Sequence, residues 1–268
     1  MYIFKNILLI SLIAVFATAS DGYVERKKLL VKGDFVRSDE LGNVFLVNDN
    51  QLIKYSPEGV VLHTYSNLYS GDITFVDTHD PFKLLLYYRD FGKVEFLDHS
   101  LSLASSTIDL NMLGLSLATL ACASYQGAFW VYNPMNFEMV RVNSGLEISE
   151  RSGNLQQVTG KTPDPNYMLE RDNFLYLNDP AIGILIFDKY GTYYKTIPVK
   201  GLTSFQVFDR KLIYVTGTSI NIYDTRLNEV QSTALPFEGA RSVSACMSVD
   251  PPRLFMLDEG RLLFYDIK

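Results

Sequence analysis

The first side chains to consider for chemistry are three histidines, His63, His79 and His99, because imidazole binds metals and transfers protons near neutral pH. No pair of them has the spacing of zinc ligands, and neither cysteine of the chain supplements them. The sequence also contains no Gly-x-Ser-x-Gly nucleophile motif and no glycine-rich phosphate loop. We therefore expect three surface histidines and no catalytic set.

A second candidate chemistry is the coordination of a divalent cation, which prefers carboxylate and amide oxygens. The residues that could supply these oxygens are Asp72, Asn154 and Glu170, which lie far apart in the sequence. Carboxylates near strand ends are also common as solvated groups without any ligand. Whether these three residues meet depends on the elements that carry them.

One pattern recurs along most of the chain: an apolar strand, a turn, and a second strand that alternates apolar and polar residues. It is seen six times, over residues 43–65, 83–108, 127–143, 174–199, 211–235 and 253–268. In most copies the second strand ends in an apolar or aromatic residue followed by Asp or Ser, as in Phe187-Asp188. Aromatic residues make up 13% of the chain, which favours strands because broad rings pack well on a pleated surface.

A further short strand is predicted before each hairpin, over residues 35–39, 72–77, 117–124, 167–171, 205–209 and 243–249. The starts of these strands are about 42 residues apart on average, within the range of roughly 40 to 50 residues typical of four-stranded propeller blades. Six repeats therefore predict an all-β, six-bladed β-propeller. A two-sheet β-sandwich would also give short strands at regular spacing and is the alternative architecture.

The two ends of the repeat array predict how the ring closes. The sixth repeat stops at Lys268 after three strands, whereas residues 23–31 form a strand without a hairpin partner. An N-terminal strand that completes the C-terminal blade would close the ring and protect the strand edges that an open array exposes. We therefore predict a single propeller domain over residues 20–268.

This organisation resembles the six-bladed propellers of the NHL, TolB and gluconolactonase-like group over nearly all of the chain after residue 19. The resemblance lies in the architecture, because the sequence has no WD dipeptide and no kelch Gly-Gly. A gluconolactonase-like protein implies a Glu, an Asn and an Asp around a divalent metal in the channel, for which Glu170, Asn154 and Asp72 are the matching types. TolB-like propellers are interaction modules of the cell envelope, which implies a protein partner.

The first 19 residues predict a cleavable secretory signal. A single early cation, Lys5, precedes an apolar stretch over residues 7–16, and Ala17-Thr18-Ala19 is the small-residue pattern that signal peptidase reads. The apolar stretch is shorter than the roughly 20 residues of a membrane-spanning helix, so an uncleaved anchor is the weaker alternative. We expect a periplasmic or secreted protein without stable membrane insertion after cleavage.

The two cysteines are predicted to lie on opposite sides of the ring. Cys122 and Cys246 fall in the first strands of repeats 3 and 6, which are half a turn apart. A disulfide needs α-carbons within roughly 7 Å, and opposite walls of a channel are farther apart. We predict two free, buried thiols that act as small apolar packing residues.

The longest segment outside the repeats covers residues 144–166 and is polar, with two prolines. We expect a loop on one face of the ring near the channel mouth, because it leads from an outer strand to the next inner strand. Its candidate partner-binding residues are the uncharged hydrogen-bonding residues Asn154, Gln156 and Gln157. In Tyr87-Tyr88 and Tyr193-Tyr194, neighbouring rings point to opposite faces of a strand, so at most one ring of each pair can be buried in one layer.

A complete ring without a catalytic set favours a non-enzymatic scaffold that presents loops to a protein partner at a cell-envelope assembly. Two alternatives remain: a metal-dependent hydrolase or lactonase with acids at the channel mouth, and a small ligand or glycan bound in the central channel. The net charge of −6 argues against nucleic-acid binding as a main activity. We expect no cofactor, and the sequence does not define the oligomeric state.

Overall fold

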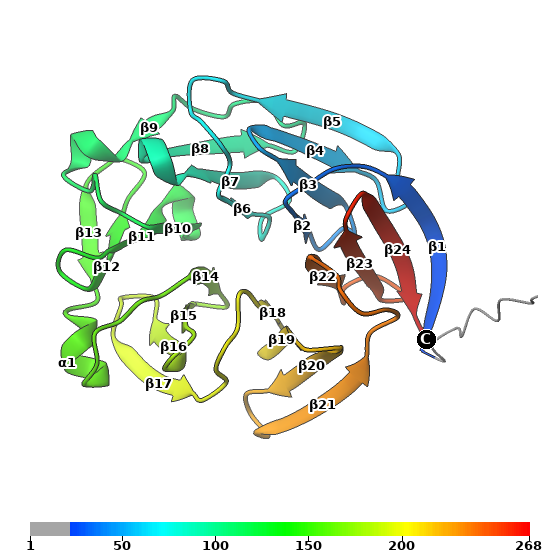
Figure 1. Cartoon of the computed structure of the whole chain (residues 1–268). Helices are drawn as coiled ribbons and strands as arrows, with labels where there is room; N and C mark the ends of the chain where they lie inside the picture. Colours follow the sequence, from blue (N-terminus) through cyan, green and yellow to red (C-terminus); the bar gives the residue numbers. More distant parts are fainter. Residues whose placement is uncertain (1–21) are drawn as a thin grey trace, which may run out of the picture.

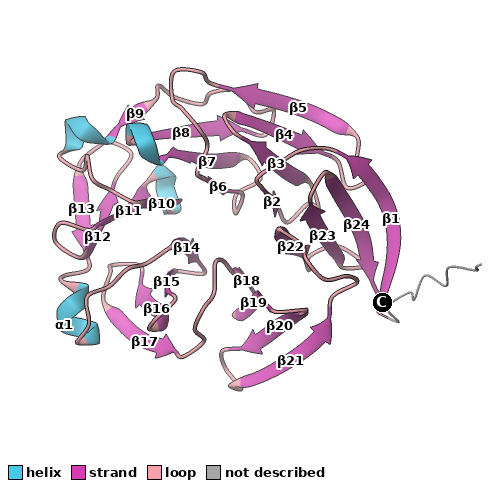
Figure 2. Ribbon diagram, viewed as in Figure 1, coloured by secondary structure: helices cyan, strands magenta, loops and turns pink. Residues whose placement is uncertain are grey.

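Each sequence repeat folds into one four-stranded antiparallel sheet, and the computed structural model arranges the six sheets around a central channel (Figures 1 and 2). The structure describes residues 22–268, so the predicted signal peptide over residues 1–19 lies outside the described residues. Within residues 22–268 the regular elements are strands apart from one α-helix, α1 (Leu155–Thr159), and three short 3-10 helices. No helix of this part is long and apolar enough to cross a membrane. The predicted six-bladed β-propeller is confirmed.

The strands of each blade follow one another from the channel to the rim. Blade 1 consists of β2 (Phe35–Ser38), β3 (Val44–Asn48), β4 (Gln51–Tyr55) and β5 (Val61–Ser66). Blade 2 consists of β6 (Phe75–Asp77), β7 (Lys83–Tyr88), β8 (Lys93–Asp98) and β9 (Ile108–Asp109). Blade 3 consists of β10 (Leu120–Ala123), β11 (Phe129–Asn133), β12 (Glu138–Val142) and β13 (Ile148–Arg151). Blade 4 consists of β14 (Tyr167–Arg171), β15 (Phe174–Asp179), β16 (Gly183–Asp188) and β17 (Tyr193–Ile197). Blade 5 consists of β18 (Gln206–Phe208), β19 (Lys211–Thr216), β20 (Ser219–Asp224) and β21 (Glu229–Ala234). Blade 6 consists of β22 (Ser242–Cys246), β23 (Arg253–Asp258), β24 (Arg261–Ile267) and β1 (Tyr23–Leu30).

The ring closes as predicted. Strand β1 pairs antiparallel with β24, in a register that runs from Tyr23 opposite Ile267 to Leu30 opposite Arg261. Figure 1 shows the blue N-terminal strand beside the red C-terminal one. The fourth strand of blade 6 therefore comes from the opposite end of the described chain, and this pairing covers the outer edge of β24.

Five of the six channel-lining strands are shorter than predicted, and β6 and β10 differ most, with three and four residues in place of six and eight. Strand β6 begins at Phe75 because the N–H of Ile73 bonds instead to the carbonyl of Asp49 in blade 1, at 2.9 Å. Strand β10 begins at Leu120 because the N–H of Ala118 bonds to the carbonyl of Leu115 and closes a turn. Strand β14 has the predicted bounds.

The loops of the ring fall on two faces, because antiparallel neighbours reverse the chain direction at every turn. We call the side that carries the turns after the first and third strands the first-turn face. The side that carries the turns after the second and fourth strands is the return face. The first-turn face therefore holds the carboxyl ends of the six channel strands.

The recurring aromatic-Asp pair has a structural role in the turn after the third strand. The Asp98 carboxylate accepts hydrogen bonds from the N–H groups of Ser100 and Ser102, at 2.8 and 2.9 Å. Asp188 accepts in the same way from Tyr190 and Thr192. Short polar side chains that bond the backbone two and four residues later stabilise a tight turn, which explains the pattern without any ligand.

The core consists of side chains packed between neighbouring blades. Tyr87 and Tyr88 are both buried, but in different layers, since Tyr87 packs towards blade 3 and Tyr88 towards blade 1. Tyr193 and Tyr194 of the rim strand β17 are 40% and 63% exposed. In both pairs, therefore, at most one ring is buried in any one layer, as predicted.

The prediction for the cysteines is confirmed. Cys122 in β10 and Cys246 in β22 are both free and buried, and they belong to blades 3 and 6. Burial raises the pKa of the Cys122 thiol well above its ordinary value, so the reactive thiolate is strongly disfavoured.

The expectation of one long loop over residues 144–166 is wrong. The segment contains β13, the rim strand of blade 3, and then helix α1. Strand β13 was missed because it has only four residues, three of which pair in register with β12, and the register shifts between Arg141 and Val142. Helix α1 lies at the outer edge of the ring beside β13 and β17, away from the channel (Figure 1).

Candidate functional site

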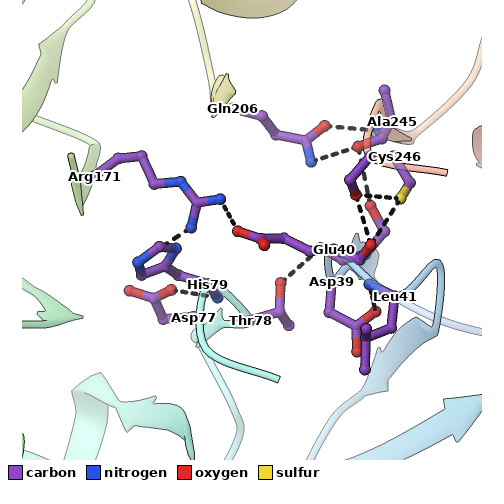
Figure 3. A network of polar contacts seen from close by, with 12 residues as sticks. Asp39, Glu40, Leu41, Asp77, Thr78, His79, Arg171, Gln206, Ala245 and Cys246 are labelled. Carbon is purple, nitrogen blue, oxygen red and sulfur yellow. Dashed lines mark hydrogen bonds and ion pairs between the residues drawn. The ribbon is translucent and has the colours of Figure 1, made fainter. Parts of the chain in front are cut away.

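Polar side chains join three blades at the channel mouth on the first-turn face (Figure 3). Arg171, the last residue of β14, forms an ion pair with Glu40 of blade 1 and also donates to Nε2 of His79 of blade 2, at 3.1 Å. The Arg171 side chain is 12% exposed and that of Glu40 45% exposed. Burial lowers the pKa of Arg171 from its ordinary value, an effect that the charge of Asp172 opposes. We call these three residues the mouth latch.

Further hydrogen bonds link neighbouring blades around the same mouth (Figure 3). The Thr78 hydroxyl of blade 2 donates to the carbonyl of Ser38 in blade 1, at 2.8 Å. The Ser248 hydroxyl of blade 6 donates to the carbonyl of Glu40, at 2.6 Å. The Gln206 amide of blade 5 makes two bonds, of 3.0 and 2.7 Å, with the backbone of Ala245 in blade 6. Hydrogen bonds between neighbouring blades thus hold the mouth together.

Arg171→Met is expected to lower the free energy of unfolding by about 1 kcal/mol, because the ion pair with Glu40 is lost. The loss stays small because half-exposed Glu40 regains hydration. The loss should shrink as salt rises, since salt screens the ion pair. Urea denaturation at low and high NaCl measures both effects. Arg226→Met, which removes the ion pairs of a more exposed arginine with Asp209 and Asp224, is the matched control and should change stability less. Equal, salt-independent losses in both variants would contradict a bracing role for the latch.

Two buried carboxyl groups lie in the channel wall below the latch. Asp77 accepts hydrogen bonds from the N–H groups of His79 and Ala123, both at 3.0 Å. Burial raises the pKa of Asp77 to about 7, although the Ala123 N–H and the charge of Arg37 act to lower it. Each of its oxygens already has a backbone donor, which favours a structural role.

Glu170, the second of these groups, has a raised pKa because it is buried. Its Oε2 accepts from the Ser124 hydroxyl at 2.6 Å and from the Trp130 indole N–H at 2.8 Å. A carboxylate bonded to an indole and a hydroxyl is held in one orientation by its own fold. Glu170 therefore ties blade 4 to blade 3.

The predicted metal-binding residues have three different surroundings. Asp72 is exposed in the return-face loop before β6, and Glu170 is buried in a channel strand. Asn154 lies at the outer edge of the ring, at the start of α1. Within residues 22–268 no group of three or more His, Cys, Asp and Glu side chains is placed to hold a metal ion.

The predicted partner-binding residues belong to helix α1. The Asn154 side-chain oxygen accepts from the N–H groups of Gln156 and Gln157, at 2.9 and 3.2 Å, and so caps the helix. Its amide nitrogen donates to the carbonyl of Asn136, at 3.0 Å. Gln156 and Gln157 are exposed, but they stand at the rim and not at the expected channel mouth. Asn154 is therefore a capping residue that also ties α1 to the turn between β11 and β12.

All three histidines are exposed, as predicted. Of the three histidines, only His79 belongs to the mouth latch, through its contact with Arg171. Its partner Arg171 comes from a strand 92 residues later in the chain. Sequence spacing alone could not reveal this contact.

Side chains from four blades narrow the channel at its waist. The Arg37 guanidinium lies 4.9 Å from the centre of the Phe35 ring and 5.5 Å from that of Tyr167. Tyr167 also packs edge-on against Phe75 and Phe205, with ring centres 5.4 and 5.2 Å apart. One cavity of about 100 Å³ lies on the first-turn side of these side chains. Another, of about 300 Å³, lies towards the return-face loops of blades 4 and 5.

Five large apolar side chains are exposed on three return-face loops of blades 1 to 3, over residues 67–74, 89–92 and 110–119. They are Leu68, Tyr69, Phe91, Met112 and Leu117, with exposed fractions of 79%, 87%, 54%, 85% and 56%. We call this set the return-face band. Large exposed apolar side chains that gather on one surface mark sites of protein contact.

Direct contacts hold the loops of the return-face band together. The Lys93 ammonium donates to the carbonyl of Tyr69 at 2.6 Å and lies 5.7 Å from the centre of the Phe91 ring. The N–H of Leu110 donates to the carbonyl of Gly92 at 2.8 Å. Gly71 has a φ of +80°, and a Cβ there would lie 2.5 Å from the Phe91 ring, so glycine permits this close approach. The three loops therefore form one continuous surface.

Sequence reasoning missed the return-face band. The available signal was the presence of Leu68-Tyr69 and of Met112 to Leu117 in segments that lack strand alternation. Apolar residues in loops are common, however, and only the ring geometry shows that loops from blades 1, 2 and 3 meet.

No protein-family model matches the chain, and no curated protein matches its sequence. Solved structures do match its fold. The Pan2 WD40 domain of Neurospora crassa aligns with a TM-score of 0.60 at 10% identity, over 92% of this chain and 96% of that domain. A chain of a mitotic checkpoint complex aligns with a TM-score of 0.61 at 10% identity, over 98% and 99%. A catalytically inactive virginiamycin B lyase from Staphylococcus aureus, with quinupristin, aligns with a TM-score of 0.57 at 13% identity, over 90% and 83%.

These matches show the fold and nothing finer, because the sequence identities are low. The resemblance to NHL- and TolB-like propellers is confirmed as one of architecture. The class that the fold defines is the six-bladed β-propeller with its ring closed by the N-terminal strand.

Proposed function

We propose that this protein is a secreted or periplasmic, non-enzymatic propeller that binds a protein partner through the return-face band. The observation that carries the proposal is the exposure of Tyr69, Phe91 and Met112 on contacting loops of neighbouring blades. Aromatic and methionine side chains are enriched at protein interfaces, where they offer large contact areas. Rigid blades behind the loops keep the ordering cost of binding low.

The channel wall supports a scaffold better than a hydrolase. Asp77 and Glu170 are already bonded to donors of the protein itself, and the Cys122 thiol is buried. The matched structures comprise a WD40 domain, a checkpoint-complex chain and a lyase, so the fold alone does not select a function. The return-face band is therefore the feature on which the proposal rests.

The proposed partner presents an apolar patch with a polar margin. The band contains no charged residue, whereas Asp90, Lys93 and Asp109 lie in or beside the same loops. Such a centre and margin match the usual anatomy of a protein interface. The extracytoplasmic location comes from the predicted signal peptide, and an envelope protein is the partner consistent with it.

The double substitution of Tyr69→Ser and Met112→Ser is expected to weaken partner binding at least about 30-fold, because truncating a central interface residue costs about 2 kcal/mol or more. The test is crosslinking in cells at native expression, followed by mass spectrometry. Lys93 next to Tyr69 supplies a reactive amine at the band.

The matched control replaces Tyr194 and Leu227, which are also highly exposed but lie in blades 4 and 5, by serine. We expect one reproducible partner with crosslinks at Lys93, lost in the band variant and kept in the control. Recovery of monomer only, or equal loss in both variants, would refute the band as the binding surface.

A further inference from the structure

Arg37 is a cation in the channel with unused hydrogen-bonding capacity. Its Nη1 donates to the carbonyl of Val36 at 2.9 Å, but its Nε is buried and has no hydrogen-bond partner among the described residues. None of the ion pairs within residues 22–268 includes Arg37. Phe35 and Tyr167 hold the guanidinium by cation–π contact. Arg37 is only partly buried and lines two cavities, so a ligand that enters them reaches the guanidinium at groups other than Nε.

Asp77, the acid on which the charge of Arg37 acts, forms no ion pair with it. The charge of Arg37 acts on Asp77, yet the Asp77 oxygens accept from the N–H groups of Ala123 and His79. Burial raises the pKa of Asp77 to about 7, so at neutral pH this carboxyl group is ionised only in part. Asp77 therefore offsets the charge of Arg37 only in part.

A cavity of about 300 Å³ leads from the return-face side to Arg37. Its apolar wall includes Phe35, Tyr167, Phe205, Ile213, Tyr214 and Val243. Thr203 and Ser204 lie at the same cavity, in the loop before β18. This volume is at the lower end of the roughly 300 to 1,000 Å³ of small-molecule sites. Gln206, Arg241, Ser242 and Ser244 also line the cavity, so its wall combines apolar side chains with a comparable share of polar groups.

We propose that this cavity binds a small organic monocarboxylate with an aromatic or branched apolar body, with its carboxylate on the guanidinium of Arg37. A guanidinium matches a carboxylate in shape and charge. The rings and aliphatic side chains of the wall then remove the apolar body from water. A dianion such as phosphate fits less well, because the negative charge of Asp77 acts on Arg37 and the second arginine of the wall, Arg241, is exposed and already paired with Asp34.

This site is separate from the return-face band. The band lies on loops of blades 1 to 3, whereas the cavity is lined mainly by blades 4, 5 and 6 and by β2. The proposal therefore does not depend on the identity of a protein partner.

The test is isothermal titration of the folded protein, residues 20–268, with phenylacetate as the probe. Phenylacetamide, its neutral analogue, and inorganic phosphate are titrated in parallel. Arg37→Gln removes the charge, and Val243→Phe fills the cavity while leaving Arg37 in place. Arg226→Gln, on an exposed arginine of blade 5, is the matched control. Circular dichroism confirms that each variant is folded.

We expect one saturable site for phenylacetate, weakened about tenfold or more by Arg37→Gln and by Val243→Phe and unchanged by Arg226→Gln, since a charge-assisted hydrogen bond is lost or the space is filled. Phenylacetamide and phosphate should bind at least about tenfold more weakly than phenylacetate. If Arg37→Gln does not fold, the affinity of Val243→Phe for phenylacetate alone tests the proposal. The proposal is overturned if phenylacetate shows no saturable binding at millimolar concentration, if the folded variants bind it unchanged, or if either comparison ligand binds as tightly.

Discussion

Removal of β1 is expected to abolish cooperative folding of the propeller. Without residues 22–31, the outer edge of β24 has no partner over the register from Tyr23–Ile267 to Leu30–Arg261. The loss also removes buried Tyr23 from the apolar cluster of blades 5 and 6. An open, unpaired strand edge favours association with other chains, so we expect aggregation in place of a stable monomer.

The comparison uses one protein that begins at residue 20 and another that begins at residue 32. Size-exclusion chromatography and thermal unfolding measure the outcome. A peptide of residues 22–31 added in trans should restore a cooperative transition, whereas a peptide with the same residues in reversed order should not. A sharp, monomeric transition in the shorter protein without peptide would show that closure by β1 is dispensable.

The fold could be predicted because its information is local and repeated. Alternation, turns and a regular spacing indicate hairpins in each repeat, and the unpaired strand over residues 23–31 complements the three-stranded repeat that ends at Lys268. Both features follow from the need of every strand edge to find a partner. Strand bounds were less certain where an amide bonds outside its own blade, as for Ile73.

The candidate sites could not be predicted in the same way, because they join residues from different blades. The Glu40–Arg171 pair of the mouth latch spans 131 residues of sequence, and no local sequence pattern indicates this contact. The cap that Asn154 places on α1 is a local contact, and it was missed because the helix itself was not predicted. The position of Arg37 between the Phe35 and Tyr167 rings likewise depends on the closed ring. The residue types in the sequence thus indicate candidate site residues, but the arrangement of the blades determines which of these residues come into contact.

Blades 1 and 2 are joined by one buried carboxylate with an unusual number of donors. Glu95 of β8 is fully buried. Its two oxygens accept side-chain hydrogen bonds of 2.6 to 3.0 Å from Tyr65, Asn67, Ser70, Tyr88 and Thr107. Burial and the bond to Glu95 raise the pKa of both tyrosines, so each phenol remains a protonated donor. Removing the charge therefore disturbs five groups at once.

Glu95→Gln is expected to lower the free energy of unfolding by about 3 kcal/mol, because an amide places two N–H donors where the site requires acceptors. Urea denaturation at pH 7 measures the loss. Glu147→Gln, on an exposed turn between β12 and β13, is the matched control and should be nearly neutral. Similar values for the two variants would show that the Glu95 network contributes little.

The same network predicts how the loss depends on pH. Burial acts to raise the pKa of Glu95, but the hydrogen bonds from Tyr88, Thr107, Tyr65 and Ser70 outweigh it, and the pKa in the folded protein is lowered. The folded state then binds fewer protons than the unfolded chain, whose glutamates titrate near about 4.3. This stabilisation is complete above that pH and is lost as pH falls through the folded pKa. The difference between the unaltered protein and Glu95→Gln should therefore be largest at neutral pH and shrink below about pH 4. A difference that stays constant from pH 7 to pH 3.5 would mean that packing around the side chain, and not its charge, stabilises the junction between blades 1 and 2.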